Sequence, residues 1–197
     1  IAEQNMISIA AGVAATGKKV FASSFAMFAA GRAFEQVRNS VAYPKLPVII
    51  GATHAGISVG EDGATHQCCE DIALMRTIPG MTVLNPADDT EAKLAVKAAY
   101  ELNGPVYIRF GRLAAPVIFG DDYKFEIGKG VTLKEGNDIT VIATGLMVGE
   151  ALLAYEVLKE KGINARIINM PTIKPIDREI ILKAAKETGK IVTVEEH

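Results

Sequence analysis

The sequence predicts an α/β protein with two domains, each a doubly wound parallel sheet. Short β-branched runs alternate with segments whose apolar residues recur at helical spacing, which is typical of βα units. Hydrophobic residues make up 49% of the 197 residues, enough for one large core or two modest ones. Between Pro116 and Asn137, glycines and charged residues interrupt this pattern and indicate a domain boundary.

We predict the first domain over residues 1–118. It opens with a helix whose apolar face is formed by residues 6–13 and which stops at Gly17, a residue common at helix ends. Strands are predicted at 20–22, 47–52, 82–84 and 106–109, and further helices at 28–37, 69–78 and 88–102. The strand at 47–52 is almost entirely apolar, as expected for a strand buried on both faces of a parallel sheet.

A linker is predicted at 119–136 and a second domain at 137–197. Its predicted strands are 138–143, 165–169 and 190–194, and its helices are 148–161 and 177–188. Three strands are few for an independent domain, so we expect more chain downstream. The sequence also starts at Ile1 without a methionine. We therefore expect the first domain to be truncated at its N-terminal end and the second at its C-terminal end.

Charge and cysteine usage narrow the class of protein. A net charge of -2, with both signs interspersed, leaves no basic surplus for nucleic acid or anionic lipid. Cys68 and Cys69 are neighbours, which is poor geometry for a disulfide, and they predict free thiols in a reducing compartment such as the cytoplasm. No signal peptide and no membrane-spanning run is recognisable.

The segment at residues 51–67 is the most informative for function. It follows a predicted buried strand and contains four glycines, two acids, and His54 and His66. Loops at the carboxyl ends of parallel strands form ligand crevices, so we expect a site here. His54, Asp62 and His66 offer donors and acceptors for hydroxyls and phosphate, although such a segment can also be a plain polar loop. The spacing matches no standard zinc pattern, so no metal site is predicted in this chain.

Motifs along essentially the whole chain resemble those of transketolases. They are THAGISVGEDGATHQ at 53–67, AEQNMISIAAGVAA at 2–15, FASSFAMFAAGRAFEQVR at 21–38, MRTIPGMTVLNPADDTEA at 75–92, GPVYIRFGR at 104–112, MPTIKPIDREIIL at 170–182 and VTVEEH at 192–197. AEQNM alone is shared with deoxyxylulose phosphate synthases and the β subunits of 2-oxo acid dehydrogenases. The resemblance implies a pyrimidine-binding domain of the thiamine diphosphate-binding fold, followed by the start of a transketolase C-terminal domain.

The resemblance implies which residues hold the cofactor. Glu3 matches the glutamate that hydrogen-bonds the aminopyrimidine ring of thiamine diphosphate, and we expect its buried carboxyl to have a raised pKa. Taken alone, Glu3 could simply favour the helix dipole. Phe25 and Phe28 match aromatic residues around the pyrimidine, although this spacing also suits plain core packing. Gly31 stands where several transketolases have another aromatic residue, which implies a looser or differently filled pocket.

The substrate contacts are implied in the same way. His54 and His66 match the pair that contacts the substrate and the bound intermediate, and Asp62 matches the acid that binds a hydroxyl of the donor sugar. Arg112 aligns with the arginine that binds the phosphate of phosphorylated sugars, and Arg109 is expected to assist it. Either arginine could instead form an ordinary ion pair.

The resemblance also implies a partner. Transketolases bind Mg²⁺ and the diphosphate through a separate N-terminal domain whose motifs are not in these 197 residues. We therefore expect an N-terminal diphosphate-binding subunit, homodimer-like contacts and an α₂β₂-like assembly that transfers ketol units between phosphorylated sugars in the pentose phosphate pathway. The alternatives are a deoxyxylulose phosphate synthase, which usually lacks a histidine at the position of His54, a 2-oxo acid dehydrogenase β subunit, and a non-catalytic partner subunit.

Overall fold

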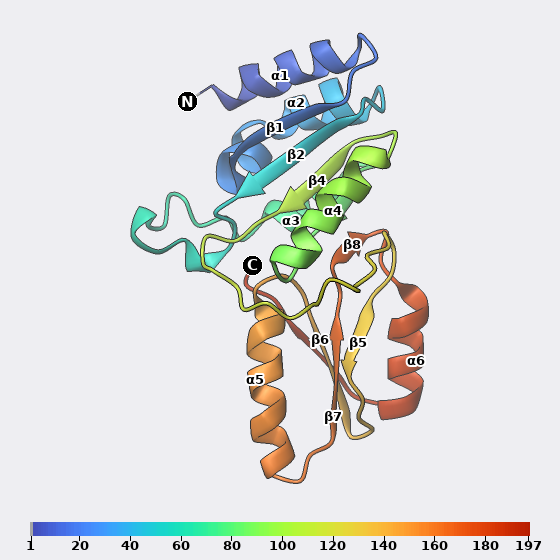
Figure 1. The fold of residues 1–197 in the computed structure, drawn as a ribbon. Helices are drawn as coiled ribbons and strands as arrows, with labels where there is room; N and C mark the ends of the chain where they lie inside the picture. The colour runs from blue at the N-terminus through green and yellow to red at the C-terminus, as the bar shows by residue number, and fades with distance from the viewer. Residues whose placement is uncertain (1) are drawn as a thin grey trace.

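A computed structural model describes residues 2–197 and contains two sheets flanked by helices, which confirms the α/β class (Figure 1). The helical elements are α1 (Glu3–Ala14), η1 (Met27–Arg32), α2 (Phe34–Gln36), η2 (Val37–Ala42), η3 (Ile57–Asp62), α3 (Asp71–Thr77), α4 (Asp89–Glu101), α5 (Met147–Glu160) and α6 (Arg178–Thr188). The strands are β1 (Val20–Phe25), β2 (Val48–Thr53), β3 (Thr82–Leu84), β4 (Val106–Arg109), β5 (Val131–Lys134), β6 (Ile139–Ala143), β7 (Ala165–Asn169), β8 (Thr172–Lys174) and β9 (Ile191–Val194).

The first sheet has the order β1-β2-β4-β3-β8, and its first four strands are parallel. Neighbouring residues of β2 point to opposite faces, so both faces need cover. Ile50 packs in the core beneath α1, η1, η2 and α3, whereas Ile49 packs in the core beneath α4. This double cover explains why the sequence of β2 is apolar almost throughout.

The second sheet has the order β5-β7-β6-β9, with β5 antiparallel to its neighbour and the other three strands parallel. Val148 and Ala151 of α5 pack on one face, and Ala184 of α6 packs on the other. The carboxyl ends of β6 and β9 point toward the first domain (Figure 1).

Two strands differ from the sequence prediction. Strand β5 lies inside the predicted linker 119–136, where the surrounding glycines and charges conceal its short alternation of Val131 and Leu133. Strand β8 belongs to the second half of the chain, yet it pairs antiparallel with β3 of the first sheet. Pro171 and Pro175 flank it, and prolines are a sign against strand structure. The two halves are therefore joined by a shared sheet as well as by the linker.

A buried polar cluster also joins the halves. Glu91 of α4 is fully buried and accepts hydrogen bonds from the Tyr123 hydroxyl at 2.6 Å, the Asn169 amide at 2.8 Å and the backbone N–H of Ala87 at 2.7 Å. Asp88 caps the same helix and also accepts from two backbone N–H groups of the connecting segment. These contacts fix the second sheet against the first domain.

Candidate active site

The predicted site residues gather at the carboxyl edge of the first sheet. Phe25 ends β1 beside Thr53 at the end of β2, so His54 follows directly next to the phenyl ring. The imidazole stacks on Phe25 with ring centroids 3.9 Å apart and planes 11° from parallel. His54 has a φ of 57°, a conformation uncommon for a residue other than glycine. The end of β2 therefore turns sharply where the imidazole packs on Phe25.

Phe28 and His66 complete an aromatic cluster. Phe28 lies on η1, with its ring centroid 6.2 Å from that of Phe25. His66 comes from the end of the segment at residues 54–66, here called the site loop. Its imidazole meets Phe28 edge-on at 5.1 Å and Phe25 at 6.0 Å. Segments far apart in sequence thus bring together four of the predicted residues.

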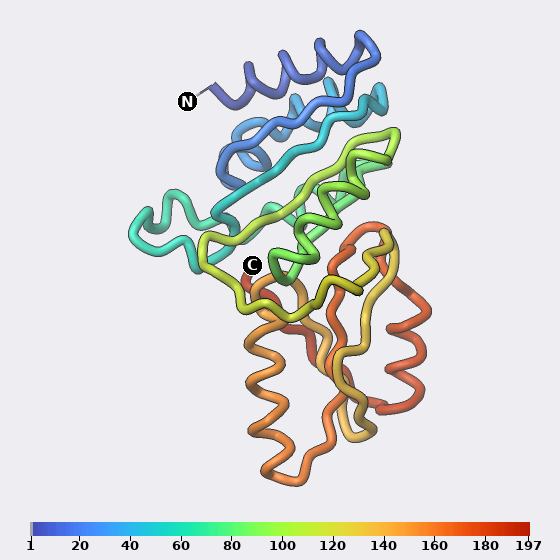
Figure 2. The backbone as a smooth tube through the Cα atoms, in the orientation of Figure 1, coloured from blue at the N-terminus to red at the C-terminus, as the bar shows by residue number. Residues whose placement is uncertain are grey.

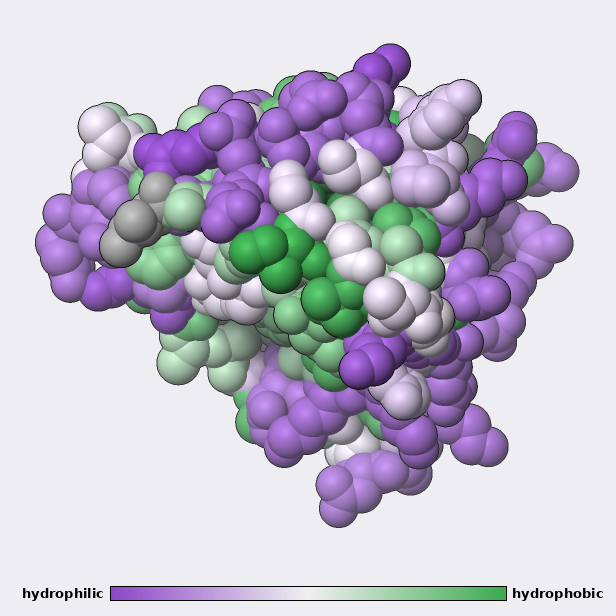
Figure 3. Space-filling model, turned by 90° about the horizontal axis from the view of Figure 1, so that it is seen from above, coloured by the Kyte–Doolittle hydropathy of each residue, from purple (hydrophilic) through white to green (hydrophobic). Residues whose placement is uncertain are grey.

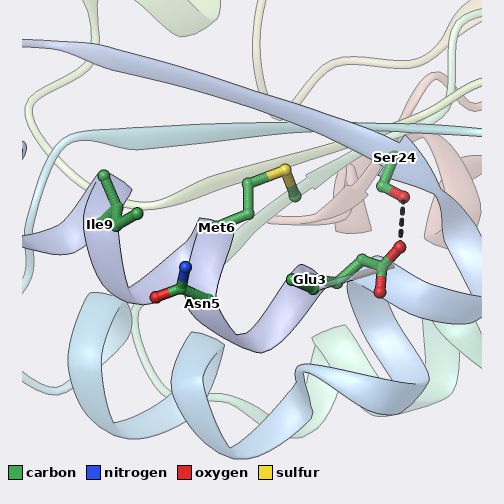
Figure 4. A pocket seen from close by; sticks show the side chains of 6 residues that line it. Glu3, Asn5, Met6, Ile9 and Ser24 are labelled. Carbon is green, nitrogen blue, oxygen red and sulfur yellow. Dashed lines mark hydrogen bonds between the residues drawn. The ribbon is translucent and has the colours of Figure 1, made fainter.

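Glu3 lies next to this cluster on the first turn of α1. It is only 6% exposed and lines a hollow of about 470 Å³ with Ser24 and residues of α1 (Figure 4). One carboxylate oxygen accepts a 3.4 Å hydrogen bond from Ser24, and the other forms a 2.9 Å ion pair with Arg32. The Arg32 guanidinium lies 4.5 Å from the centre of the Phe28 ring. Arg32 therefore connects Glu3 to the aromatic cluster.

The electrostatics of Glu3 differ from the sequence expectation. Its pKa is lowered to about 2, not raised, and the hydrogen bond from Arg32 is among the causes that outweigh the opposing effect of burial. Arg32 lies one helical turn beyond Phe28, so burial is not the only influence on this carboxyl group. In this arrangement, Glu3 is ionised at neutral pH.

Asp62 and Arg112 lie together on the other side of the site loop. Arg112 pairs with Glu61 at 2.5 Å, and its Nε atom is 3.9 Å from an Asp62 oxygen. The side chain of Arg112 is 31% exposed, so its guanidinium still reaches solvent. Gly60, with a φ of 76°, passes beneath it, and a Cβ there would lie 3.1 Å from the guanidinium. The loop backbone thus needs glycine where it approaches Arg112.

Arg109 does not belong to this site, and its predicted role in phosphate binding is withdrawn. The side chain is 1% exposed and forms ion pairs with Asp71 at 3.0 Å and with Glu196 at 3.3 Å. A guanidinium enclosed by two carboxylates inside the protein cannot reach a sugar phosphate. The alternative considered in its place was a surface ion pair, whereas both ion pairs of Arg109 are buried.

The side chain of Met27 lies next to Gly31. A Cβ at this position would lie 2.9 Å from the terminal methyl group of Met27. The methionine therefore occupies the space beside Gly31.

Sequence reasoning missed several residues that contact the predicted ones, among them Arg32, Ser24 and Glu196. Arg32 and Ser24 hold Glu3, and Glu196 contacts Arg109. Arg32 lies four residues after Phe28, a spacing that signals side-chain contact on a helix. Glu196 follows the last strand, where the carboxyl-edge rule could have identified it. Ser24 carries no such signal, because its neighbour Ser23 is equally polar and plays no such part.

Hydrogen bonds orient the two imidazoles of the site. Within residues 2–197, no group of three or more His, Cys, Asp or Glu side chains is arranged to hold a metal ion. The Nδ1 atoms of His54 and His66 lie 3.0 Å and 2.9 Å from the hydroxyls of Thr53 and Thr65. Each threonine thereby orients the imidazole that follows it.

Among residues 2–197, no helix has the length and apolarity to cross a membrane.

Comparison with known families agrees with this arrangement. The profile of the transketolase pyrimidine-binding domain matches residues 1–117, and that of the transketolase C-terminal domain matches residues 128–197. This chain belongs to the transketolase family. The family is thiamine diphosphate-dependent, and its pyrimidine-binding domain is the one that holds the predicted site.

Individual relatives show how much of a transketolase the chain represents. A transketolase C-terminal section from Methanocaldococcus jannaschii is 58% identical over the whole chain, which spans 62% of that relative. Human transketolase is 41% identical, and the chain spans 32% of it. The solved structure "Split gene transketolase, inactive beta4 tetramer" has a TM-score of 0.93 and 53% identity, and the chain covers 64% of it. The chain thus spans about three fifths of the split relatives.

Proposed function

We propose that this chain forms the pyrimidine side of a thiamine diphosphate site and, with a diphosphate-binding partner, transfers two-carbon ketol units between phosphorylated sugars. The observation that supports this most strongly is the contiguous cluster of Glu3, Phe25, Phe28, His54 and His66 at one sheet edge. Glu3 and His66 are 63 positions apart in the sequence, yet His66 contacts Phe28 and Glu3 reaches the same ring through Arg32.

The residues present fit the cofactor. A buried carboxyl group at the wall of an open hollow is suited to share a proton with a ring nitrogen. Phe28, which reaches Glu3 through Arg32, and the neighbouring Phe25 offer rings that suit a flat heterocycle. Thiamine diphosphate supplies a nucleophilic carbon that carries the two-carbon unit. Glu3 would bind the aminopyrimidine and hold the shared proton, while Phe25 and Phe28 would exclude water from it.

The ion pair between Glu3 and Arg32 is compatible with this role. The Arg32 side chain is 48% exposed, so water screens the pair and little free energy holds it. A ring nitrogen that carries the shared proton can therefore replace the guanidinium as the donor to the Glu3 oxygen. Arg32 would then remain over Phe28, at the rim of the cofactor site.

The other side chains would handle the sugar. His54 and His66 would donate hydrogen bonds to oxygens of the transferred unit, and Asp62 would accept one from a donor hydroxyl. Arg112 would bind the sugar phosphate through its planar donors, after exchanging Glu61 for the phosphate. The pair with Glu61 is exposed, since the Glu61 side chain is 79% accessible, and so it can be replaced.

The partner completes the proposal. Mg²⁺ and the diphosphate would be held by an N-terminal subunit, and an α₂β₂-like assembly with homodimer-like contacts would place that subunit against the hollow beside α1. Apolar side chains on this helix support such a contact, since Ile9 is 58% and Val13 40% exposed. Hydrophobic residues gather near the centre of the face that Figure 3 shows from above.

We propose the cytoplasm as the location and the pentose phosphate pathway as the setting, with the free thiols of Cys68 and Cys69 as support.

A related alternative is a 1-deoxy-D-xylulose 5-phosphate synthase, an activity named for a relative with 38% identity. The contact between His54 and Phe25 favours ketol transfer, because that family usually lacks this histidine. The two activities are separated by assaying the assembled enzyme with xylulose 5-phosphate plus ribose 5-phosphate and with pyruvate plus glyceraldehyde 3-phosphate. We expect turnover of the first pair only. Turnover of the second pair alone would select the synthase, and cofactor binding without any turnover would select a non-catalytic subunit.

A further inference from the structure

We propose that Glu196, at the end of the second sheet, positions the site loop of the first domain. Its side chain is buried, with 4% exposure, although it lies only one residue from the last residue of the sequence. The C-terminal end of the chain passes close to the base of the site loop, which projects from the first domain (Figure 2). This assignment rests on the proposed function for its catalytic consequence, but not for its structural part.

Glu196 contacts the site loop through three groups. One carboxylate oxygen accepts a 2.6 Å hydrogen bond from the Ser58 hydroxyl, and the backbone carbonyl accepts a 3.1 Å bond from the Ile57 N–H. The side chain also packs on Gly56, where a Cβ would lie 2.5 Å from the carboxyl carbon. Three consecutive loop residues are thus fitted to one side chain and its backbone.

The position of Glu196 is fixed independently of the loop. Its other oxygen pairs with Arg109 at 3.3 Å, and Arg109 pairs with Asp71 at 3.0 Å. Asp71 also accepts a 2.8 Å bond from the buried Tyr107 hydroxyl. Tyr107 and Arg109 lie on β4, in the middle of the first sheet. A row of buried contacts therefore runs from the sheet to Glu196 and onward to Ser58.

The loop depends on such outside contacts. Residues 57–62 form only a short helical segment that is kinked at Gly60, and Gly56 and Gly63 also have positive φ values. Such a segment has few backbone restraints of its own and needs contacts from elsewhere to hold one conformation. Ser58 lies four residues before Asp62, on the same segment. Holding Ser58 therefore fixes the N-terminal side of the kink at Gly60, while Arg112 lies beside Asp62 on the other side, and the two contacts together limit where Asp62 stands.

Glu196 is accordingly a positioning residue for donor-sugar binding, and not a catalytic one. The second domain would thus contribute to substrate binding through Glu196. Among the described residues, the carboxyl edge of its own sheet carries no cluster of aromatic and imidazole rings. Loss of Glu196 should loosen the loop and weaken substrate binding. Because Glu3 and Phe25 lie outside the loop, cofactor affinity should not change.

The test uses the assembled enzyme with Glu196→Ala, Ser58→Ala, the double variant and, as a matched control, Glu195→Gln. Glu195 is the preceding acid, and it pairs with His197 instead of the loop. Hydrogen exchange of the amides at 57–67 should speed up in Glu196→Ala and Ser58→Ala but not in the control. The KM for the donor sugar should rise about tenfold in each, without additivity in the double variant, since a hydrogen bond to a charged group is lost once.

Affinity for thiamine diphosphate should stay constant in all four variants. Unchanged loop exchange in Glu196→Ala and Ser58→Ala would overturn the proposal, as would equal losses of cofactor affinity and KM, which indicate general destabilisation. If Glu196→Ala does not fold, Ser58→Ala decides, because it removes one hydroxyl only. If the unaltered enzyme transfers no ketol group, the exchange data still decide the positioning of the loop, and the proposed function fails separately.

Discussion

The two sheets of this protein have similar architecture but different carboxyl edges. The edge of the first sheet carries Glu3, stacked aromatic and imidazole rings, and a guanidinium beside Asp62. The edge of the second borders a hollow of about 280 Å³ whose lining is mostly apolar and includes five isoleucines, with Arg76 and Glu195 as its charged residues. Function in this protein therefore lies in the segments that follow the strands and not in the sheets themselves.

The difference has a simple origin in segment length. Residues 54–70 separate β2 from α3, whereas only residues 144–146 separate β6 from α5. A long segment can carry two histidines and an acid back across the ends of neighbouring strands. A short one can only turn. Residues 144–146 are too few to carry such a set of side chains across the edge of the second sheet.

Within the comparison of the two edges, the largest expected effect comes from removing a ring at the first edge. His54→Ala should lower kcat/KM of the assembled enzyme about 100-fold, because a group that binds and orients the reacting unit is lost. The matched change at the second edge is Thr193→Ala, which also lines a hollow at a strand end. It should leave kcat/KM unchanged. Steady-state kinetics with both variants test the contrast, and equal losses would break it.

The next effect concerns the junction between the two regions. Glu91→Ala leaves three donors without their acceptor and should lower the free energy of unfolding by about 2–3 kcal/mol. Glu101→Ala, an exposed acid at the end of the same helix, is the control and should have little effect. Urea unfolding of the assembled enzyme measures both. A small effect for Glu91 would mean that the halves are not fixed by this cluster.

The same residue predicts a pH dependence. Burial raises the pKa of Glu91 above its ordinary value, so ionisation is harder in the folded than in the unfolded chain. Its contribution to stability is complete below the unfolded pKa of about 4.3 and is lost as the pH rises through the folded pKa. The stability difference between the unaltered protein and Glu91→Gln should therefore shrink from pH 4 toward pH 7. An increase over that range would contradict the direction of the shift.

A smaller effect separates phosphate binding from catalysis. Arg112→Gln should raise the KM for phosphorylated substrates about tenfold with little change in kcat, because one exposed charge-assisted contact is lost. Arg109→Gln should instead reduce stability, since it leaves two buried carboxylates unpaired. Kinetics and thermal unfolding of both variants distinguish the roles. A rise in KM with unchanged stability for Arg109→Gln would restore that residue to the site.

The smallest effect is a difference in thiol reactivity between the neighbouring residues Cys68 and Cys69. Burial, together with Asp71 and Glu70, raises the pKa of Cys68 to about 12, so its thiol is protonated at neutral pH. Cys69 is exposed. Iodoacetamide should therefore modify Cys69 in the native protein and Cys68 only after unfolding, as read by mass spectrometry. Modification of both in the native state would show that the segment before α3 is open.

Much of this could be predicted from the sequence, and the rest fails for identifiable reasons. Strands such as β2 and helices such as α4 follow from apolar periodicity, whereas β8 is hidden between two prolines and pairs with a strand far away in the sequence. The aromatic and histidine positions follow from motifs. The ion pairs of Arg32, Arg109 and Glu196 do not, because the partner of each lies in a distant segment and local spacing does not identify it.

The most direct test of the central claim is the turnover of Glu3→Gln in the assembled enzyme. Glutamine keeps the shape of the side chain but cannot hold the proton that the aminopyrimidine requires. The account predicts a loss of ketol transfer of about 1000-fold in an enzyme that still folds and assembles. Undiminished transfer by Glu3→Gln would contradict it.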